Sequence, residues 1–366
     1  MRVRIVCYED VNAWILGKFA LNLNKELNKL GIRSDIGGEP DTAADINHHI
    51  AYMNYSGAKT ACDTLMITHV DRLDRALLLG SHLKKAGMGI CMSLDALERL
   101  SAAGLPRKKL CCVNPAHDGL IKPRPLVIGI TSKLHDDGRK LERTLLKLCD
   151  SISPEDFMFR IMGSGWELIV KELREKGFTA EYSGAFDYTK YIGMVPTFDY
   201  YLYFSHDEGS MGFIDALAAG VKTIVTPQGF HLDAPGGITY PVSDLEELKV
   251  TFHKIADERS KLVNSVRNWT WANYARKHAQ IWEYVLDASK YSSLILNNVS
   301  DEKDGIASVS PDDAPDKVPF LRKTAVRMDI LIGSLRTLRR NITNIGYPLG
   351  IIKKKILRLA GKKSVK

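Results

Sequence analysis

The sequence predicts an α/β protein of two domains, each with a parallel β-sheet that helices cover on both faces. The chain has 366 residues, 45% of them hydrophobic, and a typical single domain has only about 150 residues. Short apolar runs alternate with segments of helical periodicity, which is typical of α/β folds. This alternation occurs twice, before and after a proline-containing connector at residues 122–125.

The first series starts with a β-branched run at residues 3–7, followed by a helical pattern from Trp14 to Leu27 that stops before Gly31. Strands that alternate with helices form parallel sheets, so residues 1–120 are predicted to form a Rossmann-like domain. Further strands are expected at residues 64–68, 88–92 and 110–113, and helices at residues 72–86 and 94–103.

The second series repeats this pattern and predicts a second Rossmann-like domain over residues 121–288. A helix at residues 266–286 closes the series, and the alternative is that this last helix crosses back to the first domain. Its aromatic residues are predicted to pack in a core; they are Trp269, Trp271, Tyr274 and Trp282. The strands are expected at residues 126–130, 157–162, 180–183, 200–204 and 223–225.

The C-terminal part of the chain changes in composition. Residues 289–318 are rich in Ser, Asn, Asp and Pro, which predicts a flexible acidic linker. Residues 319–366 contain 13 Lys and Arg against one acid, Asp329, with Ile and Leu at helical spacing. This pattern predicts a basic amphipathic tail that binds an anionic membrane surface rather than nucleic acid.

Composition also predicts the location of the protein. The N-terminal residues lack a signal-peptide apolar region, and no apolar run reaches the roughly 18 residues of a membrane span. The six cysteines form no C-x-x-C pair, so we expect reduced thiols rather than disulfides or zinc ligands. A cytoplasmic protein, peripheral on the inner face of the cytoplasmic membrane, is therefore predicted.

The most informative segment spans residues 205–221, where a strand leads through a glycine-containing loop into a helix. Free N–H groups at a helix start bind phosphates, so a diphosphate site is predicted. Asp207 and Asp215 stand eight positions apart, which places one in the loop and the other on the first helical turns, facing one cleft. The N–H groups expected to bind the diphosphate belong to Gly209, Ser210, Met211 and Gly212.

At these residues the sequence resembles retaining GT-B glycosyltransferases of the family 4 type. The donor site of that family has two glutamates separated by seven residues, before a run similar to residues 216–220 here. Asp207 and Asp215 take the two glutamate positions, and Glu208 is an alternative for the first. The resemblance implies that the first acid contacts the transferred sugar and that Asp215 binds the nucleotide ribose.

Neighbouring segments resemble the family in the same order. Residues 159–165, with Gly163, resemble a strand that ends in a Gly-x-Gly turn, and residues 182–186, with Ser183, resemble the next strand, ahead of a loop that receives the base. Residues 128–133 and 138–140 resemble the segments that neutralise the leaving diphosphate. The basic pair implied there is Lys133 with Arg139 or Lys140.

Three histidines were weighed as site residues. His69 follows a strand at its carboxyl edge, where α/β folds bind ligands, and it resembles the family histidine that faces the transferred sugar. A satisfied turn residue is the alternative for His69. His48 and His49 are predicted to be structural, with an acceptor contact as the alternative.

The resemblance implies a GT-B fold with two Rossmann-like domains facing a central cleft, in which residues 1–120 bind the acceptor and residues 121–288 bind the nucleotide-sugar donor. It also implies transfer of a sugar from a nucleotide-sugar, such as a UDP- or GDP-sugar, to a lipid-linked or polysaccharide acceptor with retention. Bacterial surface glycan synthesis, such as lipopolysaccharide O-antigen or capsule, is the expected setting, and polysaccharide-assembly proteins are possible partners. No Asp-x-Asp motif occurs, so neither a metal nor another cofactor is expected.

Two other functions remain open at this point. A GT-B-fold epimerase would act on the nucleotide-sugar itself and need no acceptor. A non-catalytic GT-B scaffold of a polysaccharide assembly complex would bind no nucleotide, and the replacement of both family glutamates by aspartate is the feature that favours it.

Overall fold

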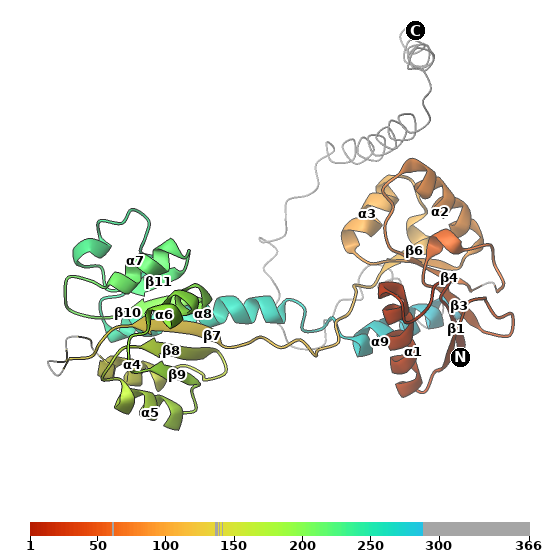
Figure 1. Ribbon diagram of the computed structural model, residues 1–366. Helices are drawn as coiled ribbons and strands as arrows, with labels where there is room; N and C mark the ends of the chain where they lie inside the picture. The colour runs from red at the N-terminus through yellow and green to blue at the C-terminus, as the bar shows by residue number, and fades with distance from the viewer. Residues whose placement is uncertain (61, 136–137, 139, 141, 288–366) are drawn as a thin grey trace, which may run out of the picture. The chain divides into compact units, whose positions relative to one another are not determined.

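The computed structural model describes residues 1–60, 62–135, 138, 140 and 142–287 (Figure 1). The predicted α/β class is confirmed, because the chain folds into two compact units with one parallel sheet each. Unit 1 consists of Met1–Gly119 with the described residues from Asn268 onward, and unit 2 is Leu120–Arg267. The central cleft stays a prediction. The predicted linker at residues 289–318 and the basic tail at residues 319–366 lie outside the described residues.

Unit 1 is a doubly wound sheet with the strand order β2-β1-β3-β4-β5-β6, and all its strand pairs are parallel. Four strands and three helices lie within two residues of their predicted bounds at each end. The elements are β1 Arg2–Val6, α1 Ile15–Lys29, β2 Arg33–Gly37, β3 Ile46–His49, η1 Tyr52–Asn54, β4 Thr64–Ile67, α2 Leu73–Lys85, β5 Met88–Cys91, α3 Leu94–Ala102, η2 Arg107–Lys109, β6 Leu110–Cys112 and α9 Trp271–Leu286.

Strand β3 was not predicted because three of its four residues are polar, yet the whole strand is buried. The polar side chains of β3 are tolerated in the core because they form hydrogen bonds with residues on β4 and just before it. Asn47 Nδ2 donates to Asp63 Oδ1 at 3.2 Å, and His48 Nδ1 lies 3.0 Å from Thr64 Oγ1. The apolar signal for a strand was therefore missing, although its environment is the core of unit 1.

Helix α9 packs on the sheet of unit 1, as in the alternative in which the last helix crosses back. Trp282 is fully buried and its Nε1 donates to Thr64 Oγ1 at 3.0 Å, while the Tyr274 hydroxyl lies 3.6 Å from Met66 Sδ. Trp271 is also buried, whereas Trp269 is 39% exposed. Core packing of the aromatic residues is confirmed for three of the four, and these three attach α9 to the first sheet.

Two imidazoles at the α9 contact make unit 1 sensitive to acid. The rings of His48 and His278 lie 5.0 Å apart, both are fully buried, and neither Nε2 has a hydrogen-bond partner among the described residues. Burial, followed by the charges of the neighbouring histidines, lowers the pKa of His48 well below its usual value. Burial lowers the pKa of His278 from 6.5 to about 4.

We expect the stability of unit 1 to fall between pH 6.5 and pH 4. In that window the unfolded chain binds a proton at His278 that the folded chain does not, which removes roughly 3 kcal/mol of unfolding free energy. Urea midpoints at pH 7.5 and pH 5 measure the loss. His278→Phe should reduce the pH dependence, and His253→Gln, at an exposed histidine of unit 2, should not. Equal midpoints at both pH values would contradict this explanation.

Unit 2 is a second doubly wound parallel sheet with the order β12-β11-β10-β7-β8-β9. Helices α4, α5 and α8 pack on one face of the sheet, and α6 and α7 pack on the other. The elements are β7 Leu126–Thr131, α4 Glu142–Cys149, β8 Phe157–Met162, α5 Glu167–Glu175, β9 Ala180–Ser183, α6 Tyr188–Met194, η3 Val195–Thr197, β10 Tyr200–Tyr203, α7 Met211–Ala218, β11 Lys222–Val225, η4 Gly229–His231, β12 Tyr240–Pro241 and α8 Leu245–Asn264.

Two further properties of the chain bear on its predicted location. All six cysteines are free thiols, four of them buried. Among the helices that the structure describes, none is long and apolar enough to span a membrane.

Candidate functional site

The sheet of unit 2 has a topological switch point between β7 and β10. The chain proceeds from β7 to β8 and β9 on one side, then returns to place β10, β11 and β12 on the other side. In open α/β sheets, ligands bind outside the carboxyl ends of the strands at this point. The segments that leave β7 and β10 there contain Lys140 and residues 205–210, so the predicted residues converge at the expected edge.

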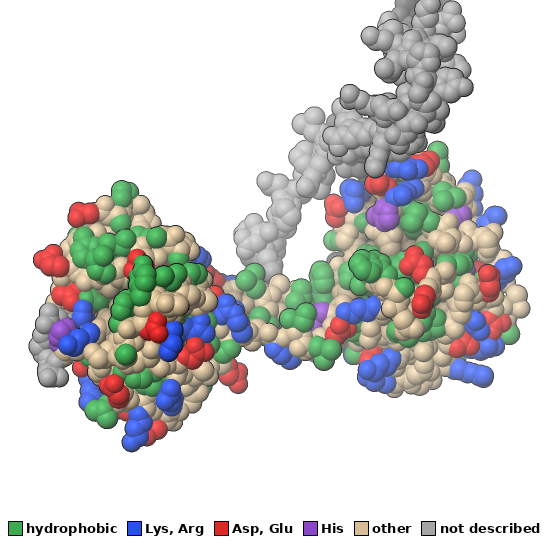
Figure 2. All heavy atoms as spheres, in the orientation of Figure 1, with side chains coloured by type: hydrophobic (Ala, Val, Ile, Leu, Met, Phe, Trp, Pro, Cys, Tyr) green, Lys and Arg blue, Asp and Glu red, His purple; other side chains and the backbone are tan. Residues whose placement is uncertain are grey.

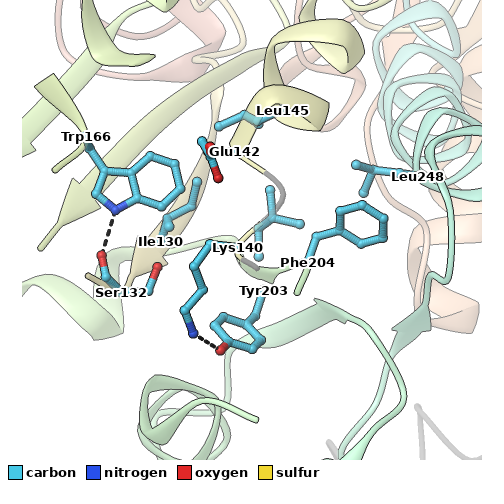
Figure 3. A pocket seen from close by; sticks show the side chains of 10 residues that line it. Ile130, Ser132, Lys140, Glu142, Leu145, Trp166, Tyr203, Phe204 and Leu248 are labelled. Carbon is cyan, nitrogen blue, oxygen red and sulfur yellow. Dashed lines mark hydrogen bonds between the residues drawn. The ribbon is translucent and has the colours of Figure 1, made fainter. Parts of the chain in front are cut away.

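Three side chains form the centre of this site. Lys140 Nζ lies 2.5 Å from Asp207 Oδ2, and the two side chains are 12% and 19% exposed. The Tyr203 hydroxyl, at the end of β10, lies 2.7 and 2.8 Å from the two carboxylate oxygens of Asp207 and accepts a hydrogen bond from Lys140. Figure 3 shows the ammonium of Lys140 directed at this hydroxyl. A cation, a phenol and a carboxylate thus meet at the switch point.

Asp207 is held in its ionised form. Partial burial alone would raise its pKa, but hydrogen bonds from Lys140, Tyr203 and the Gly209 N–H outweigh burial and lower the pKa below its usual value. At neutral pH the site therefore contains an ammonium and a carboxylate in direct contact.

The loop that opens α7 has half of its predicted N–H donors already bonded within the protein. The Gly209 N–H donates to Asp207 Oδ1 at 3.2 Å, and the Ser210 N–H donates to His231 Nε2 at 3.0 Å. Two of the four groups predicted to bind a diphosphate thus have acceptors within the protein. The two N–H groups that lack an acceptor among the described residues belong to Met211 and Gly212.

His231, in η4, is fully buried and contacts this loop. Its Nδ1 lies 3.0 Å from the carbonyl oxygen of Thr226, which only accepts hydrogen bonds. Nδ1 therefore carries the proton, and Nε2 is left as the acceptor for the Ser210 N–H. The neutral ring joins the start of α7 to the end of β11.

The first turn of α7 lies unusually close to the sheet. A Cβ atom at Gly212 would lie 2.0 Å from Thr131 Oγ1 and 2.5 Å from the Tyr201 hydroxyl. That hydroxyl lies 2.6 Å from Ser210 Oγ and 3.2 Å from Thr131 Oγ1. Gly212 is thus needed for close packing, and Tyr201 connects β7, β10 and the helix start.

Asp215 lies on the second turn of α7, as its spacing from Asp207 predicts. The Tyr191 hydroxyl of α6 donates to Asp215 Oδ2 at 2.5 Å. Burial and the neighbouring carboxylate raise the pKa of Tyr191, which keeps its hydroxyl protonated and able to donate. Apolar side chains gather around α6 and α7 (Figure 2); the exposed ones are Phe186, Tyr188, Ile192, Met211 and Ile214.

The remaining predicted residues of unit 2 that the structure describes are at the same edge of the sheet but in different roles. Gly163, at φ 139°, has its N–H bonded to the Ser183 carbonyl, and a Cβ there would lie 2.1 Å from the Ser132 carbonyl oxygen. Lys133 is exposed and pairs with no described residue. Glu208 is exposed in the loop, and Arg139 lies outside the described residues.

A small cavity of about 20 Å³ lies behind the site (Figure 3). Trp166 and Ser132 line it, and Trp166 Nε1 donates to the Ser132 carbonyl at 2.6 Å. A cavity of this size holds about one water molecule. A nucleotide would therefore lie outside it, along the edge formed by the loops after β7 and β10.

Unit 1 has its own switch point, between β1 and β3. Tyr8 follows β1, and its hydroxyl lies 2.7 Å from His49 Nδ1 at the end of β3. Burial, followed by the charges of Glu39 and Asp63, raises the pKa of Tyr8 to about 12, so the phenol stays protonated at neutral pH. His49 is buried with a hydrogen-bond partner, as its structural prediction requires. His69 is exposed after β4, with Nδ1 3.2 Å from Thr68 Oγ1.

The sequence analysis missed three supporting residues of the site in unit 2: Tyr191, Tyr203 and His231. Each holds a group that was predicted, namely Asp215, Asp207 and the Ser210 N–H. A signal existed only for Tyr203, because it lies two positions from Tyr201 and the two rings share one face of β10 next to the loop. No group of three or more His, Cys, Asp or Glu that would hold a metal ion occurs within the described part of the chain.

No protein-family model matches the sequence, and no curated protein matches it. Several solved structures are similar to the chain. Lipopolysaccharide outer core galactosyltransferase WaaB has 12% identity and a TM-score of 0.32, over 80% of this chain and 100% of that chain. HepE from Anabaena, solved in complex with UDP and glucose, has 12% identity and a TM-score of 0.30, over 81% and 98%.

Sucrose-phosphate synthase from Thermosynechococcus elongatus is also similar, with 12% identity and a TM-score of 0.33, over 78% of this chain and 99% of that chain. Two of these three proteins, the galactosyltransferase and the synthase, are named as carbohydrate-active enzymes. At identities and TM-scores this low, the similarities establish no activity for this chain.

Proposed function

We propose that this protein is a GT-B glycosyltransferase that transfers a sugar from a nucleotide-sugar to a lipid-linked or polysaccharide acceptor with retention of anomeric configuration. One observation carries the proposal. A lysine, a carboxylate and the start of a helix meet at the β7/β10 switch point of a Rossmann-like unit, which is where such folds bind nucleotides.

The chemistry of the reaction suits these groups. The bond between the anomeric carbon and the nucleoside diphosphate breaks, and a bond to an acceptor hydroxyl oxygen forms as that hydroxyl loses its proton. Negative charge develops on the leaving diphosphate, and a fixed cation stabilises it. Lys140 contacts the predicted loop at Asp207, and the N–H groups of Met211 and Gly212, which lack an acceptor among the described residues, are additional donors.

We propose that the two acidic positions bind the uncharged parts of the nucleotide-sugar, the ribose and the transferred sugar. Asp215 would bind the ribose hydroxyls, and Asp207 or Glu208 would orient the transferred sugar. The exposed ring of Phe186, 5.3 Å from the ring of Tyr191, offers a face on which a base would stack. His69 would contact the transferred sugar, and the reaction would use no metal.

The setting of the reaction is part of the same proposal. Synthesis of a bacterial surface glycan, such as lipopolysaccharide or capsule, would place the enzyme at the inner face of the cytoplasmic membrane. The basic composition of residues 319–366 supports such a location, since each basic residue near anionic lipid contributes about 1 kcal/mol of binding free energy.

The proposal is tested by thermal-shift and calorimetric titration with UDP, GDP, ADP and their sugars. We expect one nucleoside diphosphate to bind and its sugar to be consumed only when a lipid-linked or saccharide acceptor is present. A product formed without acceptor would instead indicate an epimerase. If none of the nucleotides bound, the proposed activity would be wrong and a scaffold role would replace it.

Replacing Tyr191 with phenylalanine tests the assignment of Asp215. The change removes the hydroxyl that holds Asp215 Oδ2, so the carboxylate loses its orientation and the ribose is bound less well. We expect KM for the nucleotide-sugar to rise about fivefold with kcat within about twofold. Tyr188→Phe, on the same helix and 67% exposed, is the matched control. An unchanged KM in the Tyr191 variant would argue against a ribose contact at Asp215.

A further inference from the structure

In this structure, Asp207 accepts hydrogen bonds from the groups that would bind an anionic ligand. Its carboxylate accepts hydrogen bonds from the Lys140 ammonium, the Tyr203 hydroxyl and the Gly209 N–H, and Gln228 Nε2 lies 3.5 Å away. An ammonium, a hydroxyl and a main-chain N–H at a helix start are the donors that a phosphate accepts from in proteins. The carboxylate is thus the anion that these donors share.

We propose that Asp207 is an internal competitor for the diphosphate site, and that a diphosphate binds by drawing Lys140 and the Gly209 N–H away from Asp207. The identity of the ligand rests on the proposed function. The new claim is that Asp207 and the ligand compete for the same hydrogen-bond donors. Asp207 is released by the same event that brings the sugar to it, which couples donor binding to the availability of the carboxylate.

The positions of the two side chains support this exchange of partners. Lys140 and Asp207 come from different loops, one after β7 and one after β10, so their contact crosses the switch point itself. With 12% and 19% exposure, the pair is shielded enough to hold but still open to solvent on one side. Lys140 also lies 4.5 Å from the centroid of the Tyr203 ring, so this ring remains a contact of the ammonium when the carboxylate is released.

Tyr203 is the positioning residue of this arrangement. Its hydroxyl contacts Lys140 and both oxygens of Asp207, and it also donates toward the Gly209 carbonyl at 3.2 Å. A single hydroxyl proton serves one acceptor at a time. When Asp207 moves, the same hydroxyl can therefore turn to the Gly209 carbonyl without being left unpaired.

The test measures the affinity of inorganic pyrophosphate by calorimetry, using the full chain. Asp207→Asn keeps the size of the side chain and removes the competing charge, so we expect pyrophosphate to bind about tenfold more tightly, the effect of a partly buried ion pair. Asp233→Asn removes the same charge at an exposed position just after η4, and should change the affinity by less than about twofold. Unchanged or weaker binding in Asp207→Asn would overturn the proposal.

A double-mutant cycle separates release of Lys140 from a general loss of negative charge. In a Lys140→Met background there is no ammonium to release, so adding Asp207→Asn should tighten pyrophosphate binding by much less than it does in the native chain. Equal tightening in both backgrounds would show that Asp207 acts only through repulsion and would contradict the partner exchange. Thermal unfolding of each variant checks that the fold is retained.

The same measurements distinguish this proposal from the proposed function. Tighter pyrophosphate binding in Asp207→Asn, with no nucleoside diphosphate bound by any variant, would support the internal competition and reject the nucleotide-sugar activity. If a nucleoside diphosphate bound and Asp207→Asn left its affinity unchanged, the result would support the nucleotide-sugar activity and reject the internal competition.

Discussion

Replacing Lys140 with methionine is expected to lower kcat/KM for sugar transfer by about 100-fold to 1,000-fold, the usual effect of removing one preorganised stabiliser of developing charge. Lys140 Nζ is the ammonium at the β7/β10 switch point, and its distance to Asp207 places it among the groups predicted to face the diphosphate. The larger share of the loss should appear in kcat, because negative charge on the leaving group is greatest in the transition state.

Lys171→Met is the matched control for this prediction. Lys171 lies on α5 of the same unit, is exposed, and pairs only at 3.8 Å with Glu175. We expect its kcat/KM to stay within about twofold of the native value. Steady-state kinetics with the donor found by titration measure kcat/KM of both variants, and thermal unfolding checks that both are folded. A Lys140 variant with native kcat would mean that another cation neutralises the leaving group.

Replacing Trp282 with alanine is expected to lower the unfolding free energy of unit 1 by about 3 to 5 kcal/mol. The indole is fully buried, and its loss leaves a large cavity between α9 and the sheet. The Thr64 hydroxyl, which accepts the indole N–H, would also lose a partner beside the buried His48 ring. Both effects act on the contact that attaches α9 to the first sheet.

Trp14→Ala serves as the control, because Trp14 is in the same unit but 75% exposed and makes no side-chain cap hydrogen bond. Its effect should stay within about 0.5 kcal/mol. Urea denaturation followed by circular dichroism gives both values. Similar losses for the two variants would show that α9 contributes little to the stability of unit 1.

Strands whose side chains are apolar on both faces were the easiest elements to predict. β4, β5 and β10 are buried throughout and lie within one residue of their predicted bounds, because burial in a parallel sheet requires nearly continuous apolar residues. β2 and β3 were missed because Arg33–Gly37 and Ile46–His49 lack such runs. Their polar side chains depend on partners that lie far away in the sequence.

The candidate site shows the same division. The spacing of Asp207 and Asp215 predicted one acid in the loop and one on the helix, since helical rise and loop length are local properties. The sequence analysis expected both acids to face one cleft with the N–H groups free. In the structure Asp207 binds Lys140, Asp215 binds Tyr191, and the Gly209 and Ser210 N–H groups have protein acceptors. Three of these contacts join residues that are 21 to 67 positions apart in the chain, and a local sequence pattern cannot predict such contacts.

By itself, the sequence determined the class of fold and the order of the chemically important segments, because apolar periodicity and glycine positions act over a few residues. Only the tertiary structure decided that α9 packs on unit 1, that three tyrosines and His231 support the site, and that Asp207 neutralises Lys140. Those outcomes depend on which side chains meet when strands distant in sequence become neighbours in a sheet, and that pairing is set by the burial of the whole unit.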